Sequence, residues 1–350
     1  LDRQSLPVEV LDIPANQQRH VLIEPKTIGQ RQGFNFLPTL LRLAGLLALS
    51  GLLSACASAR HAEFRDRLLR EKPALAAQAT LEVEQTSLST VKSIGLVGTD
   101  GREVAGFLRV PHGRGGREAK GFPAVVILAG RETGRDALLA IGDRDDLILI
   151  ALNYPRGERL VSPGGPFSGP RRIEEGARDA VDAIRLGIDY LSGRDDVDHR
   201  RIGVVGVSFG GIFATMAAAT HPDAAILVLV QSGGDFPELV IRHAPGWLCY
   251  MPCGLALLLA DAGLSPYAPE RFAPLVAPRP VIMINSSRDE FFPEKAARKL
   301  YDSSREPKRI VWQETDPHVD KTQTEVIRRL TGLAAGELER EGFLKPRTPS

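Results

Sequence analysis

The segment that most constrains the fold of this chain is Arg201–Gly211, a β-branched apolar run that ends on Ser208. Gly206 and Gly210 flank this serine, and the helix-like stretch Ile212–Thr220 follows at once. The order strand, sharp turn, helix is that of a nucleophile elbow, in which the strained serine needs small neighbours so that strand and helix can pass closely. The hydroxyl then stands above a helix N-terminus, which favours developing negative charge. The alternative is a tight turn with an idle serine.

A nucleophilic serine in this setting needs a base, and the acid and then the histidine follow it in sequence. Three histidines do so. His221 lies before a proline at the predicted end of the helix, and His243 lies in an apolar insertion before any strand that could carry the acid. His318 follows the strand-like run Arg309–Gln313 and a turn, where a loop can reach the edge of the sheet. We predict His318 as the base, with an ordinary loop residue as the alternative.

The acid is predicted in the loop that follows the buried-strand run Pro278–Asn285. Asp289 in this loop would accept the histidine Nδ1–H, fix the tautomer and stabilise the imidazolium. Adjacent Glu290 and the earlier Asp235 stay as alternatives. An aspartate at a strand end can also be a simple turn former.

An oxyanion site would complete this arrangement. One donor is normally the backbone N–H after the nucleophile, here that of Phe209, and the second comes from the loop after an earlier strand. That strand is Pro123–Leu128, and Gly130 behind it would let the backbone approach a substrate. We assign the second donor to the N–H of Arg131.

These motifs resemble those of the α/β-hydrolase superfamily, in the branch that holds dienelactone-hydrolase-like enzymes, acetyl esterases and prolyl-oligopeptidase-like catalytic domains. The resemblance covers about residues 81–340 and rests on Val204–Gly211, Glu175–Ile184, Ala277–Val281, Asp289 and His318. It implies an α/β fold with a mostly parallel sheet and helices on both faces. The chain departs from dienelactone hydrolases, which use a cysteine nucleophile, and it lacks the His-Gly-Gly-Gly loop of lipases.

The other apolar runs agree with such a sheet. Val91–Val97 and Val104–Val110 flank the turn Thr99–Gly101, which predicts an opening hairpin. Asp146–Leu152 is a further predicted core strand, and continuous apolar strands separated by helices indicate a parallel sheet buried on both faces.

The insertion 235–266 is rich in Leu, Ala and aromatic residues. It is either a small cap that lines an apolar acyl or alcohol pocket or an ordinary helix packed on the sheet.

The segment Arg42–Cys56 has the pattern of a secretion signal, because a short apolar core follows a basic residue and small residues precede the cysteine. Its uncharged run is too short for a comfortable membrane span. Leu53–Cys56 resembles a bacterial lipoprotein signal, in which cleavage precedes the cysteine and the cysteine is acylated. The resemblance implies membrane attachment through lipidated Cys56 in the bacterial envelope, and Ala57 favours the outer membrane, facing the periplasm. A plain signal peptide and a retained anchor are the alternatives.

The predicted organisation is therefore an over-extended N-terminus plus signal peptide over 1–55, removed on export, a lipidated cysteine and tether over 56–80, and the hydrolase domain over 81–345. The first methionine is Met216. We therefore hypothesise that the true translation start lies downstream of Leu1, which N-terminal sequencing of the unprocessed precursor would test. Cys249 and Cys253 are either bridged or free, and a CxxxC pair alone makes no metal site.

The sequence thus predicts a serine hydrolase that cleaves a small to medium carboxylic ester through an acyl-enzyme, with no metal and no cofactor. Alternatives are an acyl-CoA thioesterase or acyltransferase, a peptidase of the same superfamily, or a catalytically silent envelope-binding lipoprotein. A net charge of +1 offers no case for nucleic acid as a partner.

Overall fold

The computed structural model describes residues 36–113, 121–130, 132–155, 169–235, 238–239, 253–314, 318–319 and 322–346. The chain forms two units, Leu1–Ala48 and Leu49–Ser350. The first contains the beginning of helix α1 (Phe36–Arg70), and the second contains the sheet and the remaining described elements. Arg131, His243 and Cys249 lie outside the described residues, as do residues 236–237 and 240–252 of the insertion 235–266.

The described strands form one sheet in the order β1-β2-β3-β5-β4-β6-β7-β8-β9. The pairs β1–β2, β2–β3 and β3–β5 are antiparallel, and the pairs from β5 through β4 to β9 are parallel. The predicted hairpin and the mostly parallel sheet are therefore confirmed. The strands are β1 (Leu75–Gln85), β2 (Ser89–Gly98), β3 (Glu103–Pro111), β4 (Phe122–Leu128), β5 (Ile148–Leu152), β6 (Val197–Val207), β7 (Ala224–Val230), β8 (Val281–Ser286) and β9 (Lys308–Gln313).

The burial of each strand follows its sequence pattern. Every residue of the central strands β4, β5 and β8 is buried, as expected for parallel strands covered on both faces. Edge strand β1 is exposed along almost its whole length and begins at Leu75, within the segment 56–80 that we expected to be a tether. It forms there because its backbone pairs with β2 from end to end, a contact that an apolar pattern does not report.

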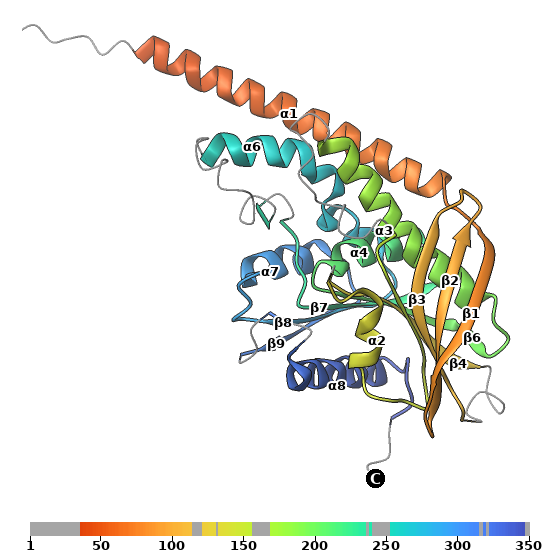
Figure 1. Cartoon of the computed structure of the whole chain (residues 1–350). Helices are drawn as coiled ribbons and strands as arrows, with labels where there is room; N and C mark the ends of the chain where they lie inside the picture. Colours follow the sequence, from red (N-terminus) through yellow and green to blue (C-terminus); the bar gives the residue numbers. More distant parts are fainter. Residues whose placement is uncertain are drawn as a thin grey trace, which may run out of the picture. The chain divides into compact units, whose positions relative to one another are not determined.

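Helices cover both faces of the sheet, as Figure 1 shows, with α3, α4 and α7 on one face and α2 and α8 on the other. Each face carries its own apolar core, so the sheet separates two packed layers. None of the helices that the structure describes is long and apolar enough to cross a membrane. Besides α1, the helices are α2 (Ala137–Ala140), α3 (Gly169–Ser192), α4 (Gly210–Thr220), α6 (Cys253–Leu264), α7 (Glu294–Ser303) and α8 (Thr324–Arg340), with short 3₁₀ turns η2 (Gly134–Asp136), η5 (Ser265–Tyr267), η6 (Pro269–Arg271) and η7 (Ala273–Leu275).

Candidate active site

The turn between β6 and α4 holds Ser208 in a left-handed backbone conformation, with φ of 54°. Such an angle is uncommon for a residue with a side chain and marks local strain that the surroundings must enforce. Two backbone hydrogen bonds do so: the Ser208 N–H donates to the Val230 carbonyl (2.9 Å), and the Gly211 N–H donates to the Ser208 carbonyl (3.0 Å). The predicted strained turn is present.

The glycines beside Ser208 are required by the close passage of strand and helix. A Cβ on Gly206 would lie 2.4 Å from the Cα of Gly211, and a Cβ on Gly210 would lie 2.0 Å from the backbone oxygen of Leu128. Both distances are far below van der Waals contact, so neither position accepts a side chain without a backbone shift. The G-x-S-x-G pattern is therefore explained by packing.

Three polar side chains meet at the carboxyl edge of the sheet. Ser208 follows β6, Asp289 follows β8 and His318 follows β9. The Ser208 Oγ lies 2.7 Å from the Nε2 of His318, and the Nδ1 of His318 lies 2.8 Å from the Oδ2 of Asp289. With Nδ1–H donating to the carboxylate, Nε2 is the acceptor for the serine hydroxyl. The structure thus brings together the three residues that sequence reasoning selected.

Asp289 is held for this contact by its own loop. It is 4% exposed, and its Oδ1 accepts the backbone N–H groups of Phe291 and Phe292, each at 2.8 Å, which leaves Oδ2 for the histidine. The alternative acids lie elsewhere: Glu290 is exposed, and Asp235 pairs with the Nζ of Lys299 at 2.8 Å. Asp289 is the acid that this geometry supports.

The alternative histidine His221 has a different environment. Its Nε2 lies 2.9 Å from the Oδ1 of Asp189 and 2.7 Å from the Nζ of Lys72, where the start of the sheet domain meets the ends of α3 and α4. Hydrogen bonds from His221 and Lys72 outweigh burial and lower the pKa of Asp189. This cluster is a structural contact that joins these elements, and it lies away from the serine.

Two contacts around the histidine loop were missed by sequence reasoning. The ring of Phe291 stacks on the ring of His318, with centroids 5.0 Å apart and an interplanar angle of 26°. Buried Gln231, which follows β7 with φ of 45°, accepts the backbone N–H of Val319 through its Oε1. The signal in the sequence that could have identified Gln231 is a polar residue directly after the apolar run Ala224–Val230.

The oxyanion donors are only partly visible. Phe209 directly precedes the first residue of α4, where its N–H is near the positive end of the helix. A Cβ on Gly130 would lie 4.0 Å from the Cβ of Ser208, so this backbone passes beside the serine. Arg131 lies outside the described residues. Within the described part of the chain, no three His, Cys, Asp or Glu side chains gather as a metal site would require.

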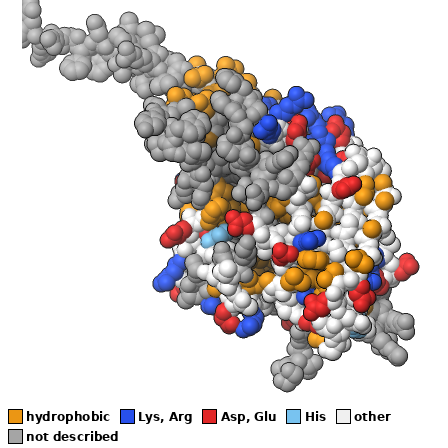
Figure 2. All heavy atoms as spheres, viewed as in Figure 1, with side chains coloured by type: hydrophobic (Ala, Val, Ile, Leu, Met, Phe, Trp, Pro, Cys, Tyr) orange, Lys and Arg blue, Asp and Glu red, His pale blue; other side chains and the backbone are white. Residues whose placement is uncertain are grey.

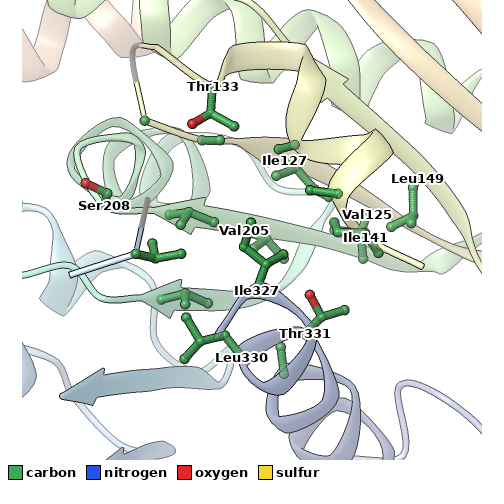
Figure 3. Close-up of a pocket in the computed structure, with 18 of the residues that line it drawn as sticks. Val125, Ile127, Thr133, Ile141, Leu149, Val205, Ser208, Ile327, Leu330 and Thr331 are labelled. Atoms are coloured by element: carbon green, nitrogen blue, oxygen red, sulfur yellow. The ribbon is translucent and has the colours of Figure 1, made fainter. Parts of the chain in front are cut away.

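A cavity of about 650 Å³ opens beside Ser208 and His318. Its lining comes from the sheet strands β4, β5 and β6 and from helices α2 and α8. Figure 3 shows Ser208 at one end of the cavity and Leu149 at the other, with Val205 and Ile327 between them. Of the residues described in the predicted cap segment 235–266, Leu239 contributes to the lining, so the cap itself stays a prediction.

Comparisons with known proteins give sequence relatives that match part of the chain. No family model matches the chain. It is 33% identical over 214 residues to an uncharacterized protein of Mycobacterium tuberculosis, covering 61% of this chain and 66% of that protein. It is 23% identical over 142 residues to the uncharacterized protein YfhR of Escherichia coli, covering 40% of this chain and 46% of YfhR. A match to poly(3-hydroxyalkanoate) depolymerase C of Paucimonas lemoignei has 26% identity over 184 residues, or 51% of this chain and 42% of the depolymerase. The chain therefore matches less than two thirds of the length of these relatives.

The solved structures establish the fold. An acetyl xylan esterase from a Paenibacillus species superposes with a TM-score of 0.59 at 19% identity, covering 77% of this chain and 92% of that one. Acetyl xylan esterase 1 from a Thermoanaerobacterium species gives 0.55 at 16% identity, covering 78% and 93%. Together with the strand order, these similarities show that the chain has the α/β-hydrolase fold.

Proposed function

We propose that this α/β-hydrolase-fold protein is a serine hydrolase that cleaves carboxylic esters through an acyl-enzyme. The observation that carries the proposal is the hydrogen-bonded series from the Oγ of Ser208 through His318 to Asp289, with distances of 2.7 and 2.8 Å. A serine hydroxyl is a weak nucleophile unless a positioned base takes its proton, and this series supplies that base. The strained φ of Ser208 supports the same role, because strained backbone conformations of this kind cluster at active sites.

The proposed reaction has two half-reactions. The Oγ of Ser208 attacks the ester carbonyl carbon while Nε2 of His318 takes the hydroxyl proton, and the backbone N–H groups of Phe209 and Arg131 stabilise the oxyanion. His318 then returns the proton to the alcohol oxygen, the C–O bond breaks and the alcohol leaves. Water, deprotonated by His318, attacks the acyl carbon, releases the carboxylic acid and restores Ser208. Asp289 holds the imidazole in the required tautomer throughout.

An ester is favoured over the other substrates of this superfamily by the comparisons. The two acetyl xylan esterases are esterases by name, and the Paucimonas protein is named for a polyester. The thioesterase, acyltransferase and peptidase alternatives share the same nucleophile, whereas a silent envelope-binding lipoprotein would have no activated serine.

A fluorophosphonate probe tests whether Ser208 is activated. We expect stoichiometric labelling of the folded protein at Ser208, because the Oγ attacks phosphorus and displaces fluoride, and we expect no labelling of Ser208→Ala. His318→Ala should label at least a thousandfold more slowly, since the base is lost. Ser287→Ala, in the loop that carries the acid, is the matched control and should label like the wild type. A folded wild-type protein that does not label contradicts the proposal and favours the silent alternative.

Helix α1 supports a proposal about where the protein is located in the cell. In α1, Leu49 and Leu52 are 44% and 63% exposed, whereas Ala57 and Phe64 are 1% and 2% exposed. Figure 2 shows hydrophobic side chains near the beginning of the described part of α1 and charged side chains toward its end. The change from exposed apolar residues to domain-packed residues occurs at exposed Cys56. We propose that cleavage before Cys56 leaves a lipid-anchored protein of the bacterial envelope, on the periplasmic side of the outer membrane.

Metabolic labelling with radioactive palmitate tests the anchor. We expect the wild-type protein to incorporate palmitate in bacterial cells and to fractionate with membranes. Cys56→Ala should lose the label, because a single acylated cysteine carries the attachment. Ser58→Ala, an exposed neighbour, should label like the wild type. Undiminished labelling of Cys56→Ala contradicts acylation at this residue.

A further inference from the structure

The floor of the cavity beside Ser208 is one face of the sheet. Val125 and Ile127 line it from β4, Ala129 lines it directly after that strand, and Val205 and Val207 line it from β6. These positions alternate along the chain, so their side chains project to the same face. From Val125 to Ala129 the lining spans four residue steps, about 13 Å of extended chain. The cavity is therefore long as well as apolar.

The roof of the cavity is helix α8. Ile327, Leu330, Thr331 and Ala334 line it at the spacing of one helical face. Figure 3 shows Ile327, Leu330 and Thr331 facing the sheet residues across the cavity. The volume stays open because Ala334 is small and because α2 is only four residues long (Ala137–Ala140), so less bulk lies over this part of the sheet than a longer helix would place there.

Protein interiors are normally packed to crystal density, and an unfilled apolar volume costs stability. A cavity of about 650 Å³ is instead in the range of ligand sites. Of the polar side chains in its lining, Thr133 and His318 lie at the end marked by Ser208, Glu132 is exposed, and Thr331 lies on α8. The guanidinium of Arg144, also in the lining, is bound to both carboxylate oxygens of Asp146 at 2.8 Å, which neutralises its charge.

We infer that this cavity holds an extended apolar acyl chain, so that the substrates are esters of medium- to long-chain carboxylic acids. The inference rests on the proposed function, because it places the reacting carbonyl at Ser208 and the hydrocarbon against Val205, Leu149 and α8. It goes beyond the small to medium ester expected from the sequence.

The order of the two half-reactions assigns the cavity to the acyl part and not to the alcohol. The alcohol must leave before water can attack, whereas the acyl group stays bound to Ser208 until the second step. A deep site closed by the sheet and α8 suits the group that remains. It would hinder the release of a long alcohol, because the alcohol would have to withdraw past Ser208.

Ester series test this assignment. With p-nitrophenyl esters of acetate, butanoate, octanoate and dodecanoate, kcat/KM should rise about fourfold for each added methylene that is buried, until the cavity is full. In alkyl acetates, lengthening the alcohol from butyl to octyl should change kcat/KM less than fivefold. A fall in kcat/KM beyond butanoate, or an equal gain from long alcohols, overturns the inference.

Two variants on α8 test whether the preference for long acyl chains depends on this cavity. Ala334→Phe should fill the cavity and lower the dodecanoate-to-butanoate ratio of kcat/KM at least tenfold. Gly332→Phe is the matched control, because Gly332 is exposed and no atom lies within 4 Å of a Cβ built there. It should leave the ratio unchanged, while thermal unfolding verifies that both variants fold. An equal loss in both variants, or in neither, argues against the cavity as the acyl site.

Direct binding separates this inference from the proposed function. Ser208→Ala should bind a fluorescent dodecanoic acid, and Ser208→Ala with Ala334→Phe should bind it at least tenfold more weakly. If the wild type neither hydrolyses esters nor labels with fluorophosphonate, the proposed function fails, and retained fatty-acid binding still supports the acyl site. If esters are hydrolysed but the fatty acid does not bind, the acyl site alone is wrong.

Discussion

Asp289→Asn is expected to lower kcat for ester hydrolysis by a factor of about 10⁴ while the protein stays folded. The amide has the shape of the carboxylate, so its oxygen can still accept the N–H groups of Phe291 and Phe292. Its nitrogen then faces the Nδ1 of His318 and donates where the carboxylate accepted. That contact selects the tautomer with the proton on Nε2, which cannot take the proton of Ser208. The measurement is the rate of p-nitrophenyl butanoate hydrolysis at saturating substrate.

Glu290→Gln is the matched control for this prediction, because it neutralises the adjacent carboxylate, which is exposed. Its kcat should stay within about twofold of the wild type, as for surface substitutions away from the chemistry. Equal losses in the two variants would show that loop integrity, and not the charge of Asp289, is being measured. A loss confined to Glu290→Gln would assign the acid to the neighbouring residue.

The position of each site residue along the chain was predictable, because the fold places the carboxyl ends of parallel strands at one edge. Ser208, Asp289 and His318 each follow an apolar run that the structure confirms as a strand. The sequence favoured Asp289 as the acid, but its pattern left adjacent Glu290 open as an alternative. The choice between them depends on two backbone N–H groups that turn one carboxylate inward, and loop geometry of this kind has no periodic signal.

The acyl cavity was not predicted, although part of its signal was present. Ile327, Leu330, Thr331 and Ala334 have the spacing of an amphipathic helix, and that pattern predicts which face packs on the sheet. It does not predict that α2 stops after four residues and leaves the face partly uncovered. The empty volume depends on how α2 and α8, which are distant in the sequence, together cover the sheet. A local sequence pattern therefore does not predict it.

The second large effect is expected on stability. Gly210→Ala should lower the free energy of unfolding by about 3 kcal/mol or more. The added Cβ would lie 2.0 Å from the backbone oxygen of Leu128 and 2.8 Å from that of Ala129. These are backbone atoms at and directly after the end of buried strand β4 and cannot rotate away, so this end of β4 must move from α4. The measurement is the urea midpoint of the purified variant at constant m-value.

Gly332→Ala makes the same chemical change in the middle of α8, where a Cβ meets no atom within 4 Å. It should raise the free energy of unfolding by about 0.5–1 kcal/mol, because alanine loses less backbone entropy than glycine in a helix. The opposite signs of the two changes in the free energy of unfolding distinguish a steric clash from an effect of helix propensity. If Gly210→Ala were as stable as the wild type, β4 and α4 would not pass as closely as the elbow requires.

The movement of β4 also has a functional consequence, because it displaces Gly130 from beside Ser208. Any fraction of Gly210→Ala that remains folded is therefore expected to hydrolyse esters more slowly than the wild type.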